Sequence, residues 1–190
     1  MTFHLRNPSS VTVATSDTWA TPQWVVDWAA WVLRWEAFDF DPCCVPATAK
    51  AAAFISPELG DGLCDPWKGT KVWVNPPYSN QGAWLRRCAS EARNGREVVA
   101  LVMPSFDAGY WRSAVWERAN EVWLVEGRIA FEVDGEPRPG GNVRSCFVVY
   151  RSKGRPPKNG PKVRYLKPRP VNWDSERPAP AVCTKDRSPV

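Results

Sequence analysis

Four consecutive residues combine a hydrogen-bond acceptor, a rigid bend and an aromatic ring: Asn75, Pro76, Pro77 and Tyr78. The two prolines remove two backbone N–H groups and hold φ near about −65°. The side-chain oxygen of Asn75 and the carbonyl of Pro76 can each accept one N–H from an amine, and the Tyr78 ring offers a face to a planar base. The pattern therefore predicts a catalytic loop that binds an exocyclic amine.

The sequence around this loop predicts where it lies. Residues 71–74 are rich in β-forming side chains, so we expect a strand that ends at Asn75, followed by an amphipathic helix over residues 80–93. Open α/β sheets bind ligands at the carboxyl ends of their strands. The alternative is a polyproline turn or a ligand for a small recognition domain, but such a peptide normally lies in a disordered stretch. The position between a strand and a helix favours the catalytic loop.

A second candidate site lies earlier in the chain. Residues 37–41 alternate and stop at Pro42, which predicts a short strand with Asp41 at its end, followed by a loop and a helix over residues 47–54. A carboxylate at a strand tip beside a helix start commonly holds a nucleoside-containing cofactor. The alternative is that Asp41 only caps a turn.

The first predicted helix begins at Thr21 and Pro22, with Thr21 as N-cap and Pro22 at the first helical position. Apolar residues then recur at helical spacing, and we expect most of these tryptophans in the core: Trp24, Val25, Trp28, Trp31, Val32 and Trp35. Trp19 precedes the cap, and we expect it to line a pocket.

The rest of the chain alternates strands and helices. Strands are predicted at residues 97–103, 121–125 and 145–150, a helix at 110–119 and an extended segment from 127. This order predicts a Rossmann-like α/β fold: a mostly parallel sheet with helices on both faces and antiparallel strands at the C-terminal end. We expect a flexible arm over 1–18, one domain over 19–150 and an extended tail over 151–190.

Charge is divided unevenly along the chain. Residues 1–150 hold 14 Lys and Arg against 17 Asp and Glu, a net −3, whereas residues 151–190 hold 11 against 3, a net +8, with 8 of the 19 prolines. Because residues 151–190 are basic and rich in proline, we expect them to be extended and solvated, and their charge would favour binding to the phosphate backbone of a nucleic acid. A merely solubilising tail is the alternative.

Several classes of protein are not expected. The six cysteines form no C-x-x-C pair and His4 is the only histidine, so neither a metal site nor a histidine-based triad is predicted. The sequence lacks a run of about 18 apolar residues and an N-terminal signal core, so we expect no membrane association and a cytoplasmic protein, in the host cell if a phage encodes it. Monomer and dimer both remain open.

Five short motifs together resemble one family. They are Trp-Ala-Thr-Pro at 19–22, Phe-Asp-Phe-Asp-Pro-Cys at 38–43, Asp-Gly-Leu at 61–63, Val-Asn-Pro-Pro-Tyr-Ser at 74–79 and Gly-Arg-Ile-Ala-Phe at 127–131. Over residues 19–150 the chain resembles the phage-type DNA N6-adenine methyltransferases (Dam-like), in the S-adenosylmethionine-dependent superfamily. It departs from the wider superfamily in lacking a G-x-G-x-x-G loop after its first strand.

The resemblance implies S-adenosylmethionine as cofactor, DNA as partner and a role for each motif. Residues implied in cofactor binding are Trp19, Thr21, Pro22, Asp41, Pro42 and Cys43, with Asp61, Gly62 and Leu63 near the cofactor's adenine. Residues 75–78 would hold the target adenine. On the body of the chain, DNA contacts are expected from Ser79, Arg86, Arg128 and Arg144.

The reaction these residues allow is direct displacement. Acceptors at Asn75 and Pro76 that bind the amine's N–H groups favour a lone pair localised toward the sulfonium methyl group, and the base must first leave the duplex and stack on Tyr78. The same loop suits cytosine N4 or the side-chain amide of a protein glutamine. A non-catalytic DNA-binding protein that keeps the loop as a fold element is the remaining alternative.

Overall fold

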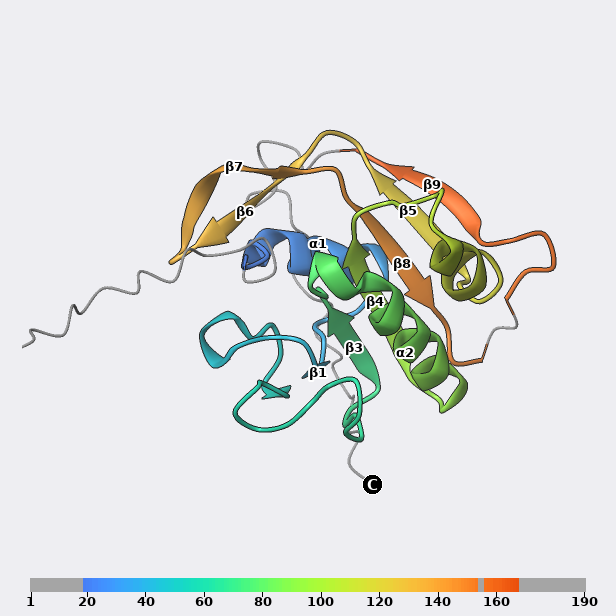
Figure 1. Cartoon of the computed structure of the whole chain (residues 1–190), viewed down its shortest axis with the longest axis horizontal. Coiled ribbons are helices and arrows are strands. Elements are labelled where there is room, and N and C mark those ends of the chain that lie inside the picture. Colours follow the sequence, from blue (N-terminus) through green and yellow to red (C-terminus); the bar gives the residue numbers. More distant parts are fainter. Residues whose placement is uncertain (1–18, 154–155, 168–190) are drawn as a thin grey trace, which may run out of the picture.

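A seven-stranded sheet forms the centre of the protein in a computed structural model that describes residues 19–153 and 156–167 (Figure 1). Its strands stand in the order β2-β1-β3-β4-β8-β5-β9. They are β1 (Phe40–Asp41), β2 (Ala53–Phe54), β3 (Lys71–Val74), β4 (Glu97–Val102), β5 (Glu121–Val125), β8 (Cys146–Tyr150) and β9 (Lys162–Leu166). A separate hairpin joins β6 (Ile129–Val133) to β7 (Glu136–Val143) and projects beyond this sheet. The helical segments are α1 (Gln23–Val32), η2 (Pro46–Thr48), η3 (Tyr78–Asn80), α2 (Gln81–Arg93) and η4 (Trp111–Trp116).

Strand directions confirm the predicted α/β class. β1 to β4 run parallel, β8 is antiparallel to both β4 and β5, and β9 is parallel to β5. Val102 at the end of β4 lies opposite Cys146 at the start of β8, which in turn lies opposite Leu124 near the end of β5. The ends of β3, β4 and β5 therefore meet at one edge of the sheet, called here the carboxyl edge.

Helices cover both faces of the sheet, as predicted. Val98 and Ala100 of β4 share a core with α2 and η4, whereas Val99 and Leu101 share a core with α1. Successive side chains of a strand point to opposite faces, so a strand buried on both sides reads as an unbroken apolar run. That explains the sequence of β4.

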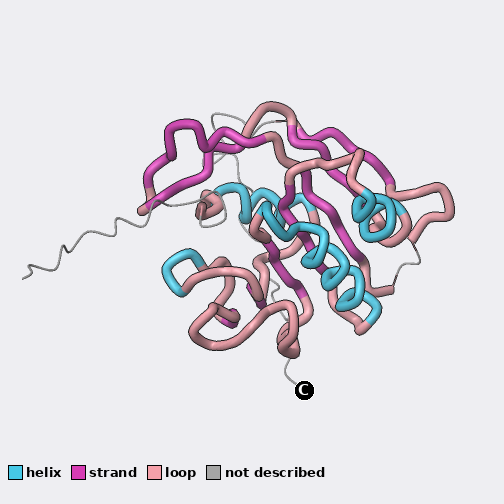
Figure 2. The backbone as a smooth tube through the Cα atoms, in the orientation of Figure 1, coloured by secondary structure: helices cyan, strands magenta, loops and turns pink. Residues whose placement is uncertain are grey.

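The helix predicted over residues 47–54 is wrong. A short turn at η2 is followed by β2, and Figure 2 shows that most of the chain between β1 and β3 is loop. The Asp41 carboxylate accepts the backbone N–H of Lys50 at 3.0 Å, and the Asp41 carbonyl accepts that of Ile55 at 2.9 Å. Pairing with β1 therefore overrides the modest helix propensity of the alanines.

The predicted start of the first helix is also wrong. Pro22 occupies the N-cap with ψ of 139°, α1 begins at Gln23, and no side chain caps it. The Thr21 hydroxyl is buried without a partner among the described residues. Trp28 is buried as expected, but Trp31 is 45% exposed.

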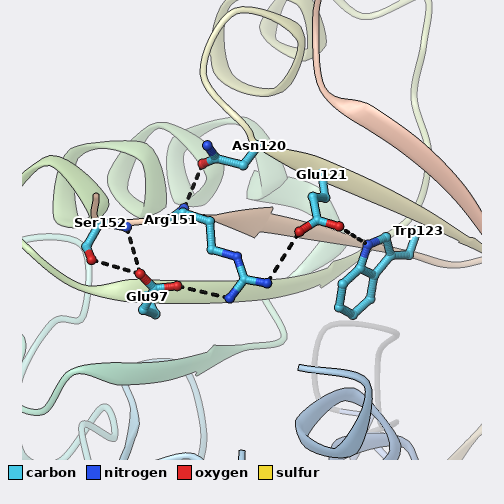
Figure 3. A network of polar contacts seen from close by, with 6 residues as sticks. All are labelled: Glu97, Asn120, Glu121, Trp123, Arg151 and Ser152. Carbon is cyan, nitrogen blue, oxygen red and sulfur yellow. Dashed lines mark hydrogen bonds and ion pairs between the residues drawn. The ribbon is translucent and has the colours of Figure 1, made fainter. Parts of the chain in front are cut away.

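A polar network fastens the chain where it leaves β8 (Figure 3). Arg151 pairs with Glu97 at 3.1 Å and with Glu121 at 3.3 Å, and the Ser152 hydroxyl donates to Glu97 at 2.8 Å. Glu121 also pairs with Arg164 of β9 at 3.0 Å. The sheet thus includes residues 162–166 of the segment expected to be a tail, whereas the expected arm and residues 168–190 lie outside the described residues.

Candidate active site

A cavity of about 470 Å³ lies next to the ends of β1 and β3. The approach to α1, the loop after β1, the loop after β2 and the predicted catalytic loop line it, together with Trp73 of β3 and Trp84 of α2. Predicted residues that it brings together are Trp19, Thr21, Asp41, Pro42, Cys43, Asp61, Gly62, Asn75 and Pro77. Residues as far apart in the sequence as Trp19 and Trp84 therefore converge on one pocket.

Four of the predicted site residues do not line this cavity: Pro22, Leu63, Pro76 and Tyr78. Pro22 and Pro76 are buried, and Leu63 packs against the core beneath α2. The Tyr78 ring stands edge-on to Phe131 of β6, with centroids 6.2 Å apart and planes at 88°. Burial raises the pKa of the Tyr78 hydroxyl well above its usual range, so it stays protonated.

Asp41 lines the pocket and also caps the loop behind it. Its carboxylate accepts the N–H of Cys43 at 3.1 Å and of Lys50 at 3.0 Å, while its side chain is almost fully buried. Burial raises its pKa from 3.8 to about 6, although both hydrogen bonds act in the opposite direction. Asp41 therefore caps the turn and also lies in the wall of the pocket, so its position is compatible with both predicted roles.

The loop over residues 61–62 is held tightly against the pocket wall. The Asp61 carboxylate accepts the N–H of Leu63 at 2.8 Å, and the Trp67 indole donates to the Gly62 carbonyl at 2.6 Å. A side chain at position 62 would collide with the carbonyl of Pro42 and with the Trp84 ring. Only glycine fits this approach, so the loop lies directly against the loop that follows β1.

The Asn75 amide is oriented by a backbone contact. Its nitrogen donates to the Trp19 carbonyl at 3.5 Å, which is long for a hydrogen bond, and its buried oxygen has no partner among the described residues. The Trp19 indole N–H and the Thr21 hydroxyl are also buried without a partner among the described residues. Buried polar groups are normally hydrogen-bonded. Three unpaired polar groups on residues that line one cavity therefore fit a polar ligand there.

Sequence reasoning missed several residues of the pocket wall. They include Cys44, Thr48, Lys50, Ser56 and Trp84. Trp84 was expected only as part of the apolar face of α2. The others belong to a segment whose path depends on Asp41, and neither periodicity nor a turn motif marks them. The adjacent Cys43 and Cys44 are both free thiols, and burial raises the pKa of Cys44 to about 12, so that thiol stays protonated.

Two of the three arginines predicted to bind DNA, Arg128 and Arg144, lie at the root of the hairpin near the carboxyl edge. Ile129 lies opposite Val143 in the hairpin, so Arg128 and Arg144 flank that pair side by side at its root. Both are exposed, as are Ser79 in η3 and Arg86 on α2. Arg87, next to Arg86 on α2, is partly buried and is bound to Glu91 at 2.9 Å and to the Asp65 carbonyl at 2.7 Å.

Within residues 19–153 and 156–167, no group of three or more His, Cys, Asp or Glu side chains is placed to bind a metal ion. Across the same residues, every helix is too short or too polar to cross a membrane.

Comparison with known proteins decides the family. The family model described as DNA N-6-adenine-methyltransferase (Dam) matches residues 8–159. The chain belongs to this family. A DNA N-6-adenine-methyltransferase of Haemophilus phage HP1 is 30% identical over 140 residues, which cover 72% of this chain and 80% of that protein. One from Escherichia phage T1 is 24% identical over 123 residues, and the match spans 64% of this chain but only half of the T1 protein.

Membership of the Dam family confirms the resemblance drawn from the five motifs, and the match extends beyond both ends of the expected 19–150. The chain is an adenine-specific DNA methyltransferase, so it acts on DNA and requires a methyl donor. Three residues that line the cavity at Asn75 carry a buried polar atom without a partner among the described residues.

Proposed function

We propose that this protein transfers a methyl group from S-adenosylmethionine to the N6 amine of an adenine flipped out of DNA, with Asn75 at the reacting centre. The observation that carries this proposal is the Asn75 side-chain oxygen, buried beside the cavity with no partner among the described residues. A preorganised acceptor in a water-poor site is worth more than the same group in water. An adenine amine supplies the matching donor.

The pocket fits the proposed cofactor in size and chemistry. Its volume of about 470 Å³ lies in the range of ligand sites, about 300–1,000 Å³. The Trp19 indole offers an N–H, the Thr21 hydroxyl can donate or accept, and Asp41 offers carboxylate oxygens. When bound, S-adenosylmethionine supplies an electrophilic methyl group on a sulfonium. These residues bind and orient it.

The catalytic loop acts on the amine by accepting its protons in hydrogen bonds. The adenine lone pair is delocalised into the ring, and acceptors at Asn75 and at the Pro76 carbonyl favour its localisation toward the methyl group. Two prolines fix the loop, so little reorganisation is needed during the reaction. No ionisable side chain is required.

The target base must be flipped to reach Asn75, at a cost of a few kcal/mol. We assign Tyr78 to contact with the flipped base. Its ring is edge-on to Phe131 and half-buried, so one part of it remains accessible. Ser79, Arg86, Arg128 and Arg144 are assigned to the surrounding DNA backbone.

The organisation of the chain follows from the same proposal. We take residues from Trp19 onward as the catalytic domain, and extend its end from 150 to Leu166 because β9 belongs to the sheet. We place the reaction in the cytoplasm of a host cell, where phage and bacterial DNA are found.

The test compares DNA from cells that express the wild-type chain with DNA from cells that express Asn75→Ala. Sequencing that distinguishes N6-methyladenine from N4-methylcytosine should find N6-methyladenine at a defined site with the wild type alone. Isothermal titration should show that both proteins bind S-adenosylmethionine. Methylcytosine in place of methyladenine, or no heat of cofactor binding to the wild type, would overturn the proposal.

A further inference from the structure

Three segments leave the carboxyl edge in strand order: the catalytic loop after β3, residues 103–110 after β4, and the hairpin root after β5. The middle loop therefore leaves the sheet from β4, the strand next to the one that ends in the proposed adenine-binding residues. It carries Phe106, whose side chain is 67% exposed. A large aromatic ring thus lies exposed on the loop that leaves the carboxyl edge next to the catalytic loop.

Both ends of the loop that carries Phe106 are fastened to the start of α2. The Gln81 side chain accepts the N–H of Met103 at 2.7 Å and donates to the Tyr110 hydroxyl at 3.4 Å. Gly82 lies so close to the Tyr110 ring that a Cβ there would approach it to 2.9 Å. Because α2 follows the catalytic loop directly, Phe106 has a fixed place relative to Asn75.

The Phe106 ring is also supported from below. It stands edge-on to Trp111, with centroids 5.3 Å apart and planes at 85°, and Trp111 is buried. Backbone hydrogen bonds brace the loop, from Ala108 to Ser105 at 3.0 Å and from Trp111 to Ala108 at 2.9 Å. The structure therefore holds the ring outward.

The composition of the loop indicates which part of DNA it meets. Asp107 is the only charged side chain among residues 103–110, and a carboxylate repels phosphates. An aromatic ring instead stacks on bases, and exposed apolar side chains of DNA-bending proteins enter between base steps. Removal of an adenine from the duplex leaves just such an unstacked gap.

We propose that Phe106 enters the duplex where the target adenine leaves it and stacks on the neighbouring bases, so that it lowers the cost of flipping. This proposal rests on the proposed function, because it requires a flipped adenine. Phe106 contacts substrate in this role but takes no part in methyl transfer itself.

The experiment uses two duplexes that carry the site identified by sequencing. In one the target adenine is paired with thymine, and in the other it faces an abasic residue, which removes its pairing. Methylation rates are measured for the wild type, Phe106→Ala, Phe106→Trp and the control Trp116→Ala. Trp116 is also an exposed ring, 49% exposed, but it packs beside Gly160 in the loop before β9.

On the paired duplex, Phe106→Ala should lower kcat/KM about 5-fold to about 150-fold, the ratio that corresponds to about 1–3 kcal/mol of stacking. On the abasic duplex the loss should shrink to within about two-fold. Phe106→Trp and Trp116→Ala should stay near the wild type on both. S-adenosylmethionine affinity should be the same in all four proteins, since none of these changes lies in the cavity.

An equal loss for Phe106→Ala on both duplexes, or none on the paired duplex, would overturn this role for Phe106. Loss in Phe106→Trp as large as in Phe106→Ala would also overturn it, because tryptophan stacks at least as well. A wild-type protein that methylates neither duplex would refute the proposed function itself.

Discussion

Replacing Asn75 by Ala should separate stability from activity. The Asn75 oxygen is buried without a partner among the described residues, and a buried acceptor left unsatisfied costs about 1–3 kcal/mol. Its amide nitrogen makes one long contact with the Trp19 carbonyl, 3.5 Å, which we value at no more than about 0.5–1 kcal/mol. The alanine variant should therefore be as stable as the wild type or more stable, by up to about 2 kcal/mol.

Turnover should change in the opposite direction. Loss of one preorganised polar partner of a reacting group costs roughly 10²–10³ in rate. Cofactor affinity should change much less, because the proposed partner of the Asn75 oxygen is the substrate amine. The assays are urea denaturation of the free protein, calorimetry with S-adenosylmethionine, and single-turnover methylation of a duplex that carries the site.

Gln81 provides a matched control six residues further along the chain. It is also a buried amide, but its oxygen accepts from Met103 and its nitrogen donates to Tyr110. Gln81→Ala leaves the Met103 N–H without its partner and should lose about 1–3 kcal/mol of stability. If Asn75→Ala were destabilised as much as Gln81→Ala, or kept wild-type turnover, the unpaired oxygen would have no catalytic meaning.

Three further results are expected. Asp41 has a pKa of about 6 in the folded protein against an ordinary 3.8, so the folded state binds the proton more tightly than the unfolded state does. At about 1.4 kcal/mol per pKa unit, the free energy of unfolding should fall by about 3 kcal/mol as pH rises from about 4 to 6 and then level off. Urea denaturation of Asp41→Asn at several pH values should lack that decline. Tyr78→Phe should keep turnover while Tyr78→Ala loses about 1–3 kcal/mol of base contact, and a large loss in the phenylalanine variant would show that the hydroxyl takes part. A chain cut after Lys167 should bind DNA nearly as the full chain does, whereas Arg128→Ala and Arg144→Ala should each reduce the slope of log affinity against log salt by about 0.9. Binding titrations at several salt concentrations measure both effects. A shallower slope for the cut chain, with unchanged slopes for the two arginine variants, would contradict this prediction.

Sequence patterns identified the elements that depend on local order. β4 was predicted from a short, unbroken apolar run, whose length fits a strand better than a helix. α2 was predicted from apolar residues at helical spacing. The position of residues 75–78 at the end of a strand was predicted correctly, because a β-rich segment and two prolines mark it. Local chemistry decides these parts of the fold.

The loop between β1 and β3 was predicted poorly because long-range contacts decide its path. Asp41 binds the backbone at Lys50, and Gly62 lies against Pro42 and Trp84, contacts that no local pattern reveals. The wall of the pocket is built from this loop, so Lys50 and its neighbours were missed there. The T-shaped contact of the Tyr78 ring with Phe131, 53 residues away, was likewise not predicted, and the predicted stacking of a base on Tyr78 stays a prediction.

The distribution of positive charge changes what the C-terminal segment is expected to do. Seven of the eleven basic residues of 151–190 lie within 151–167, which holds no acidic residue, so residues 168–190 carry a net charge of only +1.

Tyr150 lies opposite Val98, and Lys162 lies opposite Glu121, so β8 ends and β9 begins at the edge of the sheet away from Asn75. Arg151 and Arg164 are engaged with acidic residues of the sheet. Charges at that edge lie far from the carboxyl edge, where we propose that DNA binds, and at 0.1 M salt the interaction between charges is screened beyond about 10 Å. We therefore expect phosphate contacts chiefly from Arg128 and Arg144 at the root of the hairpin. A cut after Arg151, by contrast, would also remove β9 and so would measure the loss of a sheet edge together with any loss of DNA affinity.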